Sequence, residues 1–546
     1  MNPSNRFFNR VAFALILLGL VLPPVAAQIV ARPPEKLLGM YIHQHWAYNH
    51  PYAARTWTIE DWRGYLEGLK RLGFNMVLIW PMLETMPDPL TPSDEANLAK
   101  IAMVIDMAHR DYGMKANIVL CPNVSARNEA AARYTFEKRP FFATDDRVDP
   151  ADPVAFGALM AWREKLIRPL VAADGVFIID SDPGGYPHST NLDFVYLLGA
   201  HRRMLDRLRP GIEVVYWSHF GWEAYGKFYA TGELFNAAGE VLRGPPSEAA
   251  EAVTFMAQQP RLEPWSVANS GFPGDFLNGI GQGDRVLGFP YGAIESEPSY
   301  PFTIYGGKPR VSSGGRKLKA AYPGGQQGGA RGVLGNSQTH CVQLPNLFAF
   351  SRGAQGLPAE TADYVRFAND LIPGRGELIV EGWDALQGDN SERMTAAETQ
   401  LAALSPATLR GGPLGGLLFG SPSRFIDDLV AQLHAKSALL ALRVLVKATP
   451  RDERRVTGAL AAFATAAVTW QERHSYGNFW AWSEMDETLR ALGDPAVIAV
   501  LDTRTFVSKE GATPFERVKN GLARLEDYSP RLVVAIQQAA DNRKKR

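Results

Sequence analysis

Carboxylate side chains follow an apolar segment of this chain at residue 180, and their spacing could support chemistry. The apolar run Gly175-Val-Phe-Ile-Ile179 leads directly into Asp180-Ser181-Asp182 and then into a Pro-Gly-Gly turn. Such a run is typical of a buried strand in a parallel sheet, and its abrupt polar end marks the C-terminal end of that strand. Because Asp180 and Asp182 are two positions apart, an extended strand would put both side chains on one side. We therefore expect a paired-carboxylate site here.

The C-terminal ends of the other expected strands carry imidazole, amide, indole and carboxylate groups. Carboxylates and amides can bind the hydroxyl groups of a sugar, and aromatic rings can cover its apolar faces. This mixture favours a carbohydrate substrate. The candidate substrate-binding residues are His43, His45, Trp80, Glu84, Asn123, His219, Trp222, Asn336 and His340.

Cleavage of a glycosidic bond needs an acid for the leaving oxygen and a second group that stabilises or attacks the anomeric carbon. Two nearby carboxylates can divide these roles, because each charge raises the pKa of the other group. We expect Asp182 to be the acid and Asp180 to orient or stabilise, with Glu295 and Glu297 as alternative catalytic partners. A purely structural alternative also stands, in which Asp180 caps a turn and Asp182-Pro-Gly-Gly is only turn chemistry.

Two other functions are compatible with the same residues. The chain could be a carbohydrate-binding barrel without catalytic activity. It could also be a metal-dependent hydrolase, because His43 and His45 put two imidazoles on one side of a strand, and Asp180 or His219 could complete the ligand set. Sugar-binding histidines explain that pair equally well, so we expect neither a metal ion nor a cofactor.

Short apolar strands alternate with amphipathic helices over the first two thirds of the chain. The sequence Thr58-Ile-Glu-Asp61 predicts a helix start. Eight strand–helix repeats indicate an α/β chain with a (β/α)8 barrel of the TIM type. After about residue 356 only helical spacing remains, so we expect a barrel at 28–355 and an all-helical region at 356–546. The expected strands are 37–46, 75–82, 115–121, 176–179, 213–217, 264–268, 286–292 and 332–335.

The first 27 residues have the pattern of a secretory signal. Arg6 and Arg10 precede an apolar run at 11–22, and small residues lead to a cleavage point after Ala27. The run is short for a membrane span, which needs about 20 residues. We therefore expect a periplasmic or secreted protein that has no membrane contact after cleavage.

The overall charge and the cysteines narrow the class of protein further. Lys and Arg total 57, as do Asp and Glu, so no basic excess favours nucleic acid as a partner. Only Cys121 and Cys341 are present, and they form either one bridge or two buried thiols.

Three stretches together resemble the barrels of glycoside hydrolases. They are Gly39-Met-Tyr-Ile-His-Gln-His-Trp46, the segment from Trp57 to Trp80-Pro81, and the carboxylates after the fourth strand. The groups that the chain resembles are the β-N-acetylhexosaminidase and O-GlcNAcase-like enzymes and, secondarily, the α-glucuronidases. In both groups a helical region follows the barrel.

The two resemblances imply different mechanisms. In the hexosaminidase-like group, adjacent acidic residues act as the general acid and as a support for the acetamido group of the substrate. Here Ser181 separates the two carboxylates, which departs from that pattern. The glucuronidase-like group implies that Asp182 acts with Glu295 or Glu297. In either case residues 335–340 would line the site.

Overall fold

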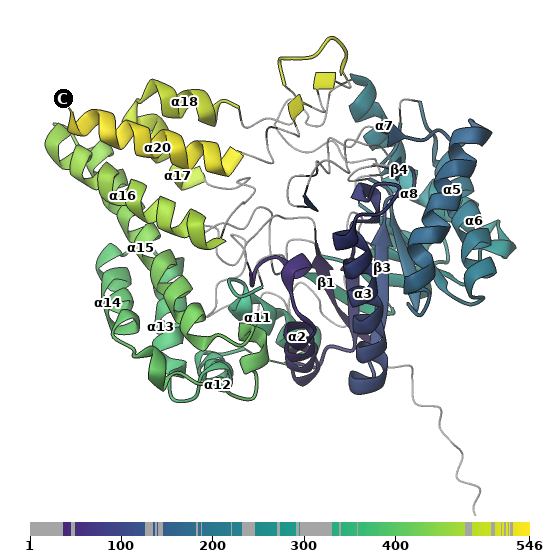
Figure 1. The fold of residues 1–546 in the computed structure, drawn as a ribbon, viewed down its shortest axis with the longest axis horizontal. Coiled ribbons are helices and arrows are strands. Elements are labelled where there is room, and N and C mark those ends of the chain that lie inside the picture. Colours follow the sequence, from purple (N-terminus) through teal and green to yellow (C-terminus); the bar gives the residue numbers. More distant parts are fainter. Residues whose placement is uncertain are drawn as a thin grey trace, which may run out of the picture. The chain divides into compact units, whose positions relative to one another are not determined.

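Eight parallel strands close into a barrel in the computed structural model (Figure 1). Each strand pairs with its neighbours along the chain, and the last pairs with the first. All eight expected strands are thereby confirmed, with ends that differ by a few residues. The barrel strands are β1 (Leu37–His43), β2 (Met76–Trp80), β3 (Lys115–Leu120), β6 (Gly175–Ile179), β7 (Glu213–Ser218), β8 (Trp265–Asn269), β9 (Val286–Gly288) and β10 (Gly332–Asn336).

The structure describes most of the chain between Lys36 and Lys545. The described residues are 36–44, 50–125, 135–136, 139, 146–181, 184–186, 188–219, 221–231, 246–269, 274–290, 294, 330–337, 340–357, 359–474, 483–503, 508–514, 516–517, 520–521, 524 and 528–545. The expected signal segment lies outside them, as do residues 295–329, which are rich in glycine.

Helices surround the strands of the barrel, as Figure 1 shows for α2, α3, α5 and α6. Thr58 begins α2 as the sequence predicts: its hydroxyl accepts from the Asp61 backbone N–H, and Asp61 Oδ2 accepts from the Thr58 N–H (2.8 Å). This reciprocal pair satisfies two N–H groups that the helix start would otherwise leave free. The helices are α2 (Ile59–Arg71), α3 (Pro92–Tyr112), α5 (Pro153–Ile167), α6 (Asn191–Leu208), α7 (Trp222–Thr231), α8 (Pro246–Ala257), α9 (Gly274–Gly279) and α11 (Leu344–Ala354).

Alternate residues of each strand belong to two different cores. Tyr41, Trp80, Ile179 and Trp217 lie in a cluster inside the barrel. Their sequence neighbours, such as Ile178, pack instead against the surrounding helices. This period of two decides which strand-end residues reach the interior of the barrel.

After the barrel the chain is helical, as expected. Successive helices pack on one another from α12 to α16, and α20 returns against α16. Among the helices that the structure describes, α15 alone is long and apolar enough to cross a membrane, a test that buried core helices also pass. The helices are α12 (Thr361–Leu371), α13 (Gly376–Gln387), α14 (Ser391–Ala402), α15 (Pro422–Lys447), α16 (Glu453–His474), α17 (Ser483–Leu492), α18 (Pro495–Leu501) and α20 (Tyr528–Lys544).

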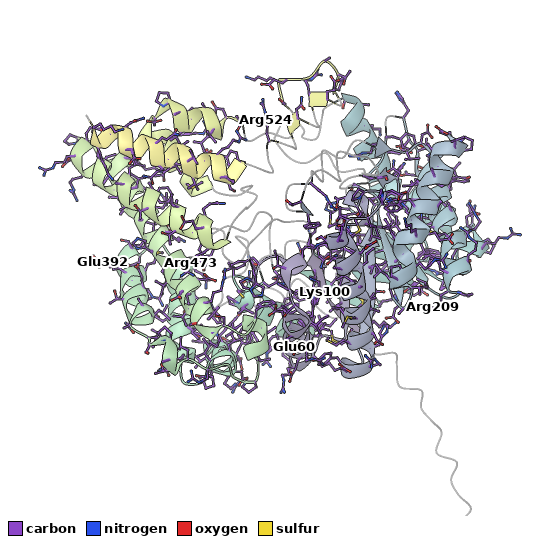
Figure 2. All side chains as sticks on the ribbon, in the orientation of Figure 1. Glu60, Lys100, Arg209, Glu392, Arg473 and Arg524 are labelled. Atoms are coloured by element: carbon purple, nitrogen blue, oxygen red, sulfur yellow. The ribbon has the colours of Figure 1, made fainter. Side chains whose placement is uncertain are left out.

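An aromatic cluster joins the helical region to the barrel. The ring of Phe419 lies 4.5 Å from Trp57 and 5.7 Å from Tyr65 of α2, between ring centroids. A second contact is polar: Tyr52 donates to Asp428 of α15 (2.7 Å). Arg473 of α16, labelled in Figure 2, donates to the other oxygen of the same carboxylate (2.8 Å). The junction is therefore both apolar and ionic.

Candidate active site

Aromatic side chains fill the barrel interior near the C-terminal ends of the strands. The rings of Trp80 and Trp217 lie 6.0 Å apart, and Tyr41 lies 5.3 Å from Trp217. Phe289, just beyond β9, lies 4.8 Å from Trp217. These four rings, which we call the aromatic floor, fill the barrel interior at this level. Each is at most 1% exposed, and the ring planes of Trp80, Tyr41 and Phe289 are tilted by 66°, 76° and 38° to that of Trp217. Aromatic carbons of this kind suit the apolar face of a sugar.

Two histidines adjoin this floor. His43, the last residue of β1, is buried with its ring 5.1 Å from Trp80 and 5.6 Å from Tyr41. His219, directly after β7, is only partly buried, with its ring 6.0 Å from Trp217. Both were expected at the site, and both lie next to the same indole floor.

Asp180 lies immediately after β6 and is fully buried. Its Oδ2 accepts from the Tyr216 hydroxyl (2.9 Å), while Oδ1 accepts from the Ser181 hydroxyl (3.0 Å) and the His219 backbone N–H (3.1 Å). Burial raises the pKa of Asp180 to about 6, although these hydrogen bonds favour the charged form.

The Tyr216 ring packs against Phe194 of α6, 5.0 Å between centroids. The Asp180 carboxylate, bound to the Tyr216 hydroxyl, therefore lies on the helix side of the barrel wall. The strand β6 ends at Ile179, and the Asp180 backbone N–H still donates to the Trp217 backbone oxygen of β7 (3.1 Å).

Ser181 links Asp180 to His219. The Ser181 hydroxyl donates to Asp180 and lies 3.3 Å from Nδ1 of His219. A serine that donates to a carboxylate still has lone pairs with which to accept from an imidazole N–H. The geometry can therefore hold His219 with a proton on Nδ1 and a lone pair on Nε2.

Glu84, in the short helix after β2, is a second buried carboxylate near the floor. It accepts from the Trp80 indole N–H (3.1 Å) and from the Cys121 backbone N–H (2.5 Å). Burial raises the pKa of Glu84, and the nearby Arg163 guanidinium opposes this. Glu84 thus fixes the Trp80 ring and the end of β3.

The side chains of two expected binding residues, Asn123 and Trp222, contact other segments of the protein. The amide of Asn123 donates to the backbone oxygens of Val148 (3.4 Å) and Gly185 (3.3 Å) and so ties together two loops. Trp222 is buried at the start of α7, where its ring lies 5.2 Å from Phe194 and 6.0 Å from Tyr186. Trp222 therefore packs in the layer between the strands and the helices.

Two other expected binding residues, Asn336 and His340, are close in the sequence but lie in different parts of the structure. Asn336, the last residue of β10, is buried, and neither polar atom of its side chain has a hydrogen-bond partner among the described residues. Its register, two residues after Leu334 of the inner core, directs it to the barrel interior. His340 instead lies in the junction with the helical region: its Nδ1 lies 3.0 Å from the Tyr65 hydroxyl and its ring 4.6 Å from Trp57. Burial lowers the pKa of His340 to about 3.

Four expected site residues lie outside the described part of the chain: Asp182, Glu295, Glu297 and His45. The carboxylate pairings and the paired histidines thus stay predictions. Within the described ranges, no three His, Cys, Asp or Glu side chains gather as a metal site. Cys121 and Cys341 are both buried free thiols, which decides between the two states expected for them.

Sequence reasoning missed three residues around the site. Trp217 forms the centre of the floor, Ser181 connects Asp180 with His219, and Tyr216 holds the Asp180 carboxylate. The alternation along β7 could have assigned Trp217 to the interior and Tyr216 to the helix side. No signal in the sequence indicates the bond between Ser181 and His219, because it joins two different strand ends.

The architecture is a closed (β/α)8 barrel. No family model matches the chain, and no curated protein matches it either. Among solved structures, the chain is similar to a mutant of the O-GlcNAc hydrolase of Thermobaculum terrenum, with 9% identity, a TM-score of 0.36 and coverage of 93% of this chain and 97% of that one.

Two further similar structures are also glycoside hydrolases. For the β-N-acetylhexosaminidase of Bacteroides fragilis, identity is 9%, the TM-score 0.34 and coverage 59% of this chain and 66% of that one. For a family GH115 4-O-methyl-α-glucuronidase, identity is 12%, the TM-score is 0.38 and coverage is 82% of this chain and 60% of that one. The chain thus spans less than two thirds of the length of these two proteins. With every TM-score below 0.5, these likenesses carry no argument about the reaction of this chain.

Proposed function

We propose that this protein is an exported glycoside hydrolase that cleaves glycosidic bonds in glycans or oligosaccharides at the C-terminal end of its barrel. The observation that carries the proposal is the floor of Tyr41, Trp80 and Trp217 with His43 and His219 beside it. Rings supply apolar surface and imidazoles supply polar contacts, a combination that suits a sugar.

In this proposal Asp182 is the general acid, and Asp180 is a positioning residue. The Asp180 carboxylate holds the Ser181 hydroxyl and the backbone of His219 at the end of two adjacent strands. His219 then offers Nε2 as an acceptor for a sugar hydroxyl, because Ser181 lies against its Nδ1. Glu295 or Glu297 supplies the second carboxylate that glycoside cleavage needs.

The test is an activity screen of the purified protein on aryl glycosides, including N-acetylhexosaminides and glucuronides. For a substrate that is turned over, we expect Asp182→Asn to lower kcat by about 10²–10⁴-fold, the usual contribution of a general acid. Asp106→Asn, on the exposed face of α3, is the matched control and should retain full activity. Unchanged turnover and binding in Asp182→Asn would remove the acid assignment.

Other results would lead to the other functions. Saturable glycan binding without turnover on any glycoside would make the chain a binding barrel. Activity that chelators abolish and added metal restores would favour the metal-dependent hydrolase based on His43 and His45. Export is tested by N-terminal sequencing of the mature protein, which should begin at Gln28.

A further inference from the structure

A cavity of about 310 Å³ lies at the opposite end of the barrel from the candidate active site. Its walls include the first residues of several strands, among them Leu37 of β1, Met76 of β2, Lys115 of β3 and Glu213 of β7. These residues belong to the N-terminal ends of the strands, whereas Asp180, His219 and Asn336 belong to the C-terminal ends. A ligand in this cavity would therefore not contact the proposed catalytic groups.

The interior of the cavity has two polar side chains without partners. Asn117 of β3 is 3% exposed and Ser266 of β8 is 2% exposed, and both line the cavity. Among the described residues, neither side chain has a hydrogen-bond partner. Neither residue is among those with a fully enclosed unpaired polar atom, so the open space of the cavity reaches both groups, and an amide and a hydroxyl can each donate to and accept from a polar occupant there.

The space for this occupant comes from a glycine. Gly175 begins β6 beside Asn117, and a Cβ at Gly175 would lie 2.9 Å from the Asn117 Oδ1. Barrel interiors are normally filled by layers of bulky side chains. Here β6 contributes no side chain to the lowest layer, and the next inward residue, Phe177, forms part of the cavity wall.

Two cationic and two anionic side chains lie at the rim of the cavity. Arg331 binds Glu213 with two hydrogen bonds (2.5 and 3.2 Å). Asp174 lies 2.8 Å from His109 and accepts from the Ala116 backbone N–H (2.8 Å). Lys115 makes no ion pair with any residue that the structure describes. Lys115 is therefore the rim cation that no described carboxylate binds, while Asp174 on the same rim has a partner that is cationic only when protonated.

We propose that this cavity binds a monosaccharide-sized sugar acid, with the carboxylate at Lys115 and the hydroxyls at Asn117 and Ser266. The volume is at the lower limit for small-molecule sites, which excludes an oligosaccharide. An amide and a hydroxyl each donate and accept, as sugar hydroxyls require. Phe177 and Leu287 in the wall supply apolar surface for the ring carbons. The site is independent of the proposed function at the other end of the barrel.

Isothermal titration of the full mature protein with D-galacturonate tests the proposal, with D-galactose as the neutral analogue. We expect saturable one-site binding of galacturonate and about two- to fivefold weaker binding of galactose, since one ion pair to the exposed Lys115 is worth about that factor. Lys115→Gln should weaken galacturonate binding by the same two- to fivefold and leave galactose unchanged. Lys70→Gln, on the exposed face of α2, is the matched control and should bind as the native protein does.

Two further variants locate the bound molecule. Asn117→Leu keeps the number of non-hydrogen side-chain atoms and removes both hydrogen-bonding atoms, so it should weaken the binding of both sugars. His219→Ala, at the other end of the barrel, should leave galacturonate binding unchanged. Absence of binding up to about 10 mM galacturonate, a limit that corresponds to negligible specific affinity, would mean that the cavity holds only water and would overturn the proposal. Loss of binding in His219→Ala, or full binding in both Lys115→Gln and Asn117→Leu, would overturn it as well.

Discussion

Asp180 shows how one carboxylate can be held without an ion pair. Four donors, from Tyr216, Ser181 and the backbones of His219 and Gly221, satisfy a fully buried group that has no cation among its hydrogen-bond partners in the described structure. Hydrogen bonds to a carboxylate favour its charged form, while burial disfavours that form. Burial has the larger effect, so the pKa of Asp180 rises to about 6. This balance has a consequence for the pH dependence of stability.

We expect Asp180→Asn to remove part of that pH dependence. Below about pH 4 the carboxyl is protonated in both the folded and the unfolded protein, so it contributes no pH dependence there. Between about pH 4 and 6 the unfolded state ionises while the folded state keeps its proton, and the free energy of unfolding therefore falls as the pH rises. One pKa unit corresponds to about 1.4 kcal/mol, so the total loss is at most about 3 kcal/mol. Urea unfolding of both proteins from pH 4 to 8 measures the difference.

The side-chain amide introduced by Asp180→Asn fits the same partners, because its oxygen can accept from Ser181 and His219 while its NH₂ donates to the Tyr216 oxygen. The variant should therefore gain stability relative to the native protein as the pH rises from 4 to 6. Tyr216→Phe, which removes a donor from Asp180, should lower stability by about 1–3 kcal/mol at pH 7. Parallel curves for Asp180→Asn and the native protein would contradict a raised pKa at Asp180.

At the scale of the elements, two glycines determine how closely the helical region approaches the barrel. Gly416, in the short helix Gly415–Leu418, faces Gly64 of α2. A Cβ at Gly416 would lie 2.3 Å from the Gly64 backbone oxygen, and one at Gly64 would lie 3.0 Å from the Gly416 Cα. Because both neighbours are backbone atoms, no side-chain rotation could relieve the clash.

We therefore expect Gly416→Ala to lower the free energy of unfolding by more than about 2 kcal/mol, as overpacking at a rigid contact does. The control is Gly458→Ala on α16, where no atom lies within 4 Å of the added Cβ. That change should stabilise the protein by about 0.5–1 kcal/mol, since alanine favours a helix interior. Thermal unfolding of both variants makes the comparison, and equal midpoints would contradict a tight approach at Gly416.

The elements themselves were largely predictable, because parallel strands buried on both faces form continuous apolar runs. Thr58 and Asp61 likewise marked the first helix start. The directions of side chains at strand ends could not be predicted, because they depend on the residue at which each strand ends. The strand β6, for example, ends at Ile179, directly before Asp180. His340 could not be assigned to the junction, since its neighbours Trp57 and Phe419 are far away along the chain. Tertiary contacts of this kind leave no pattern within one segment.

At the scale of the whole molecule, Asp428 connects the barrel with the helical region. Its carboxylate accepts from Tyr52, in the segment after β1, and from Arg473 of α16, and Arg424 lies 3.5 Å away. Burial raises the pKa of Asp428, and Tyr52 and the two arginines favour its charged form. The aromatic cluster of Trp57, Tyr65, His340 and Phe419 lies across the same junction. Separating the regions would expose both sets of contacts.

These shared contacts predict that residues of the barrel and of the helical region unfold in one cooperative transition. Tyr52→Phe leaves a buried carboxylate without one donor and should cost about 1.5–3 kcal/mol, the usual value for a hydrogen bond to a charged group. Hydrogen exchange in the globally exchanging amides of β1–β3 and of α14–α16 should then accelerate by the same factor, about 10- to 100-fold, because both amide sets report one opening reaction. Tyr112→Phe, whose hydroxyl donates to the Arg63 backbone at an exposed position, is the control and should change neither set appreciably. Faster exchange in the helical region alone would mean that the two regions unfold separately, and that the junction at Tyr52 and Asp428 does not couple them.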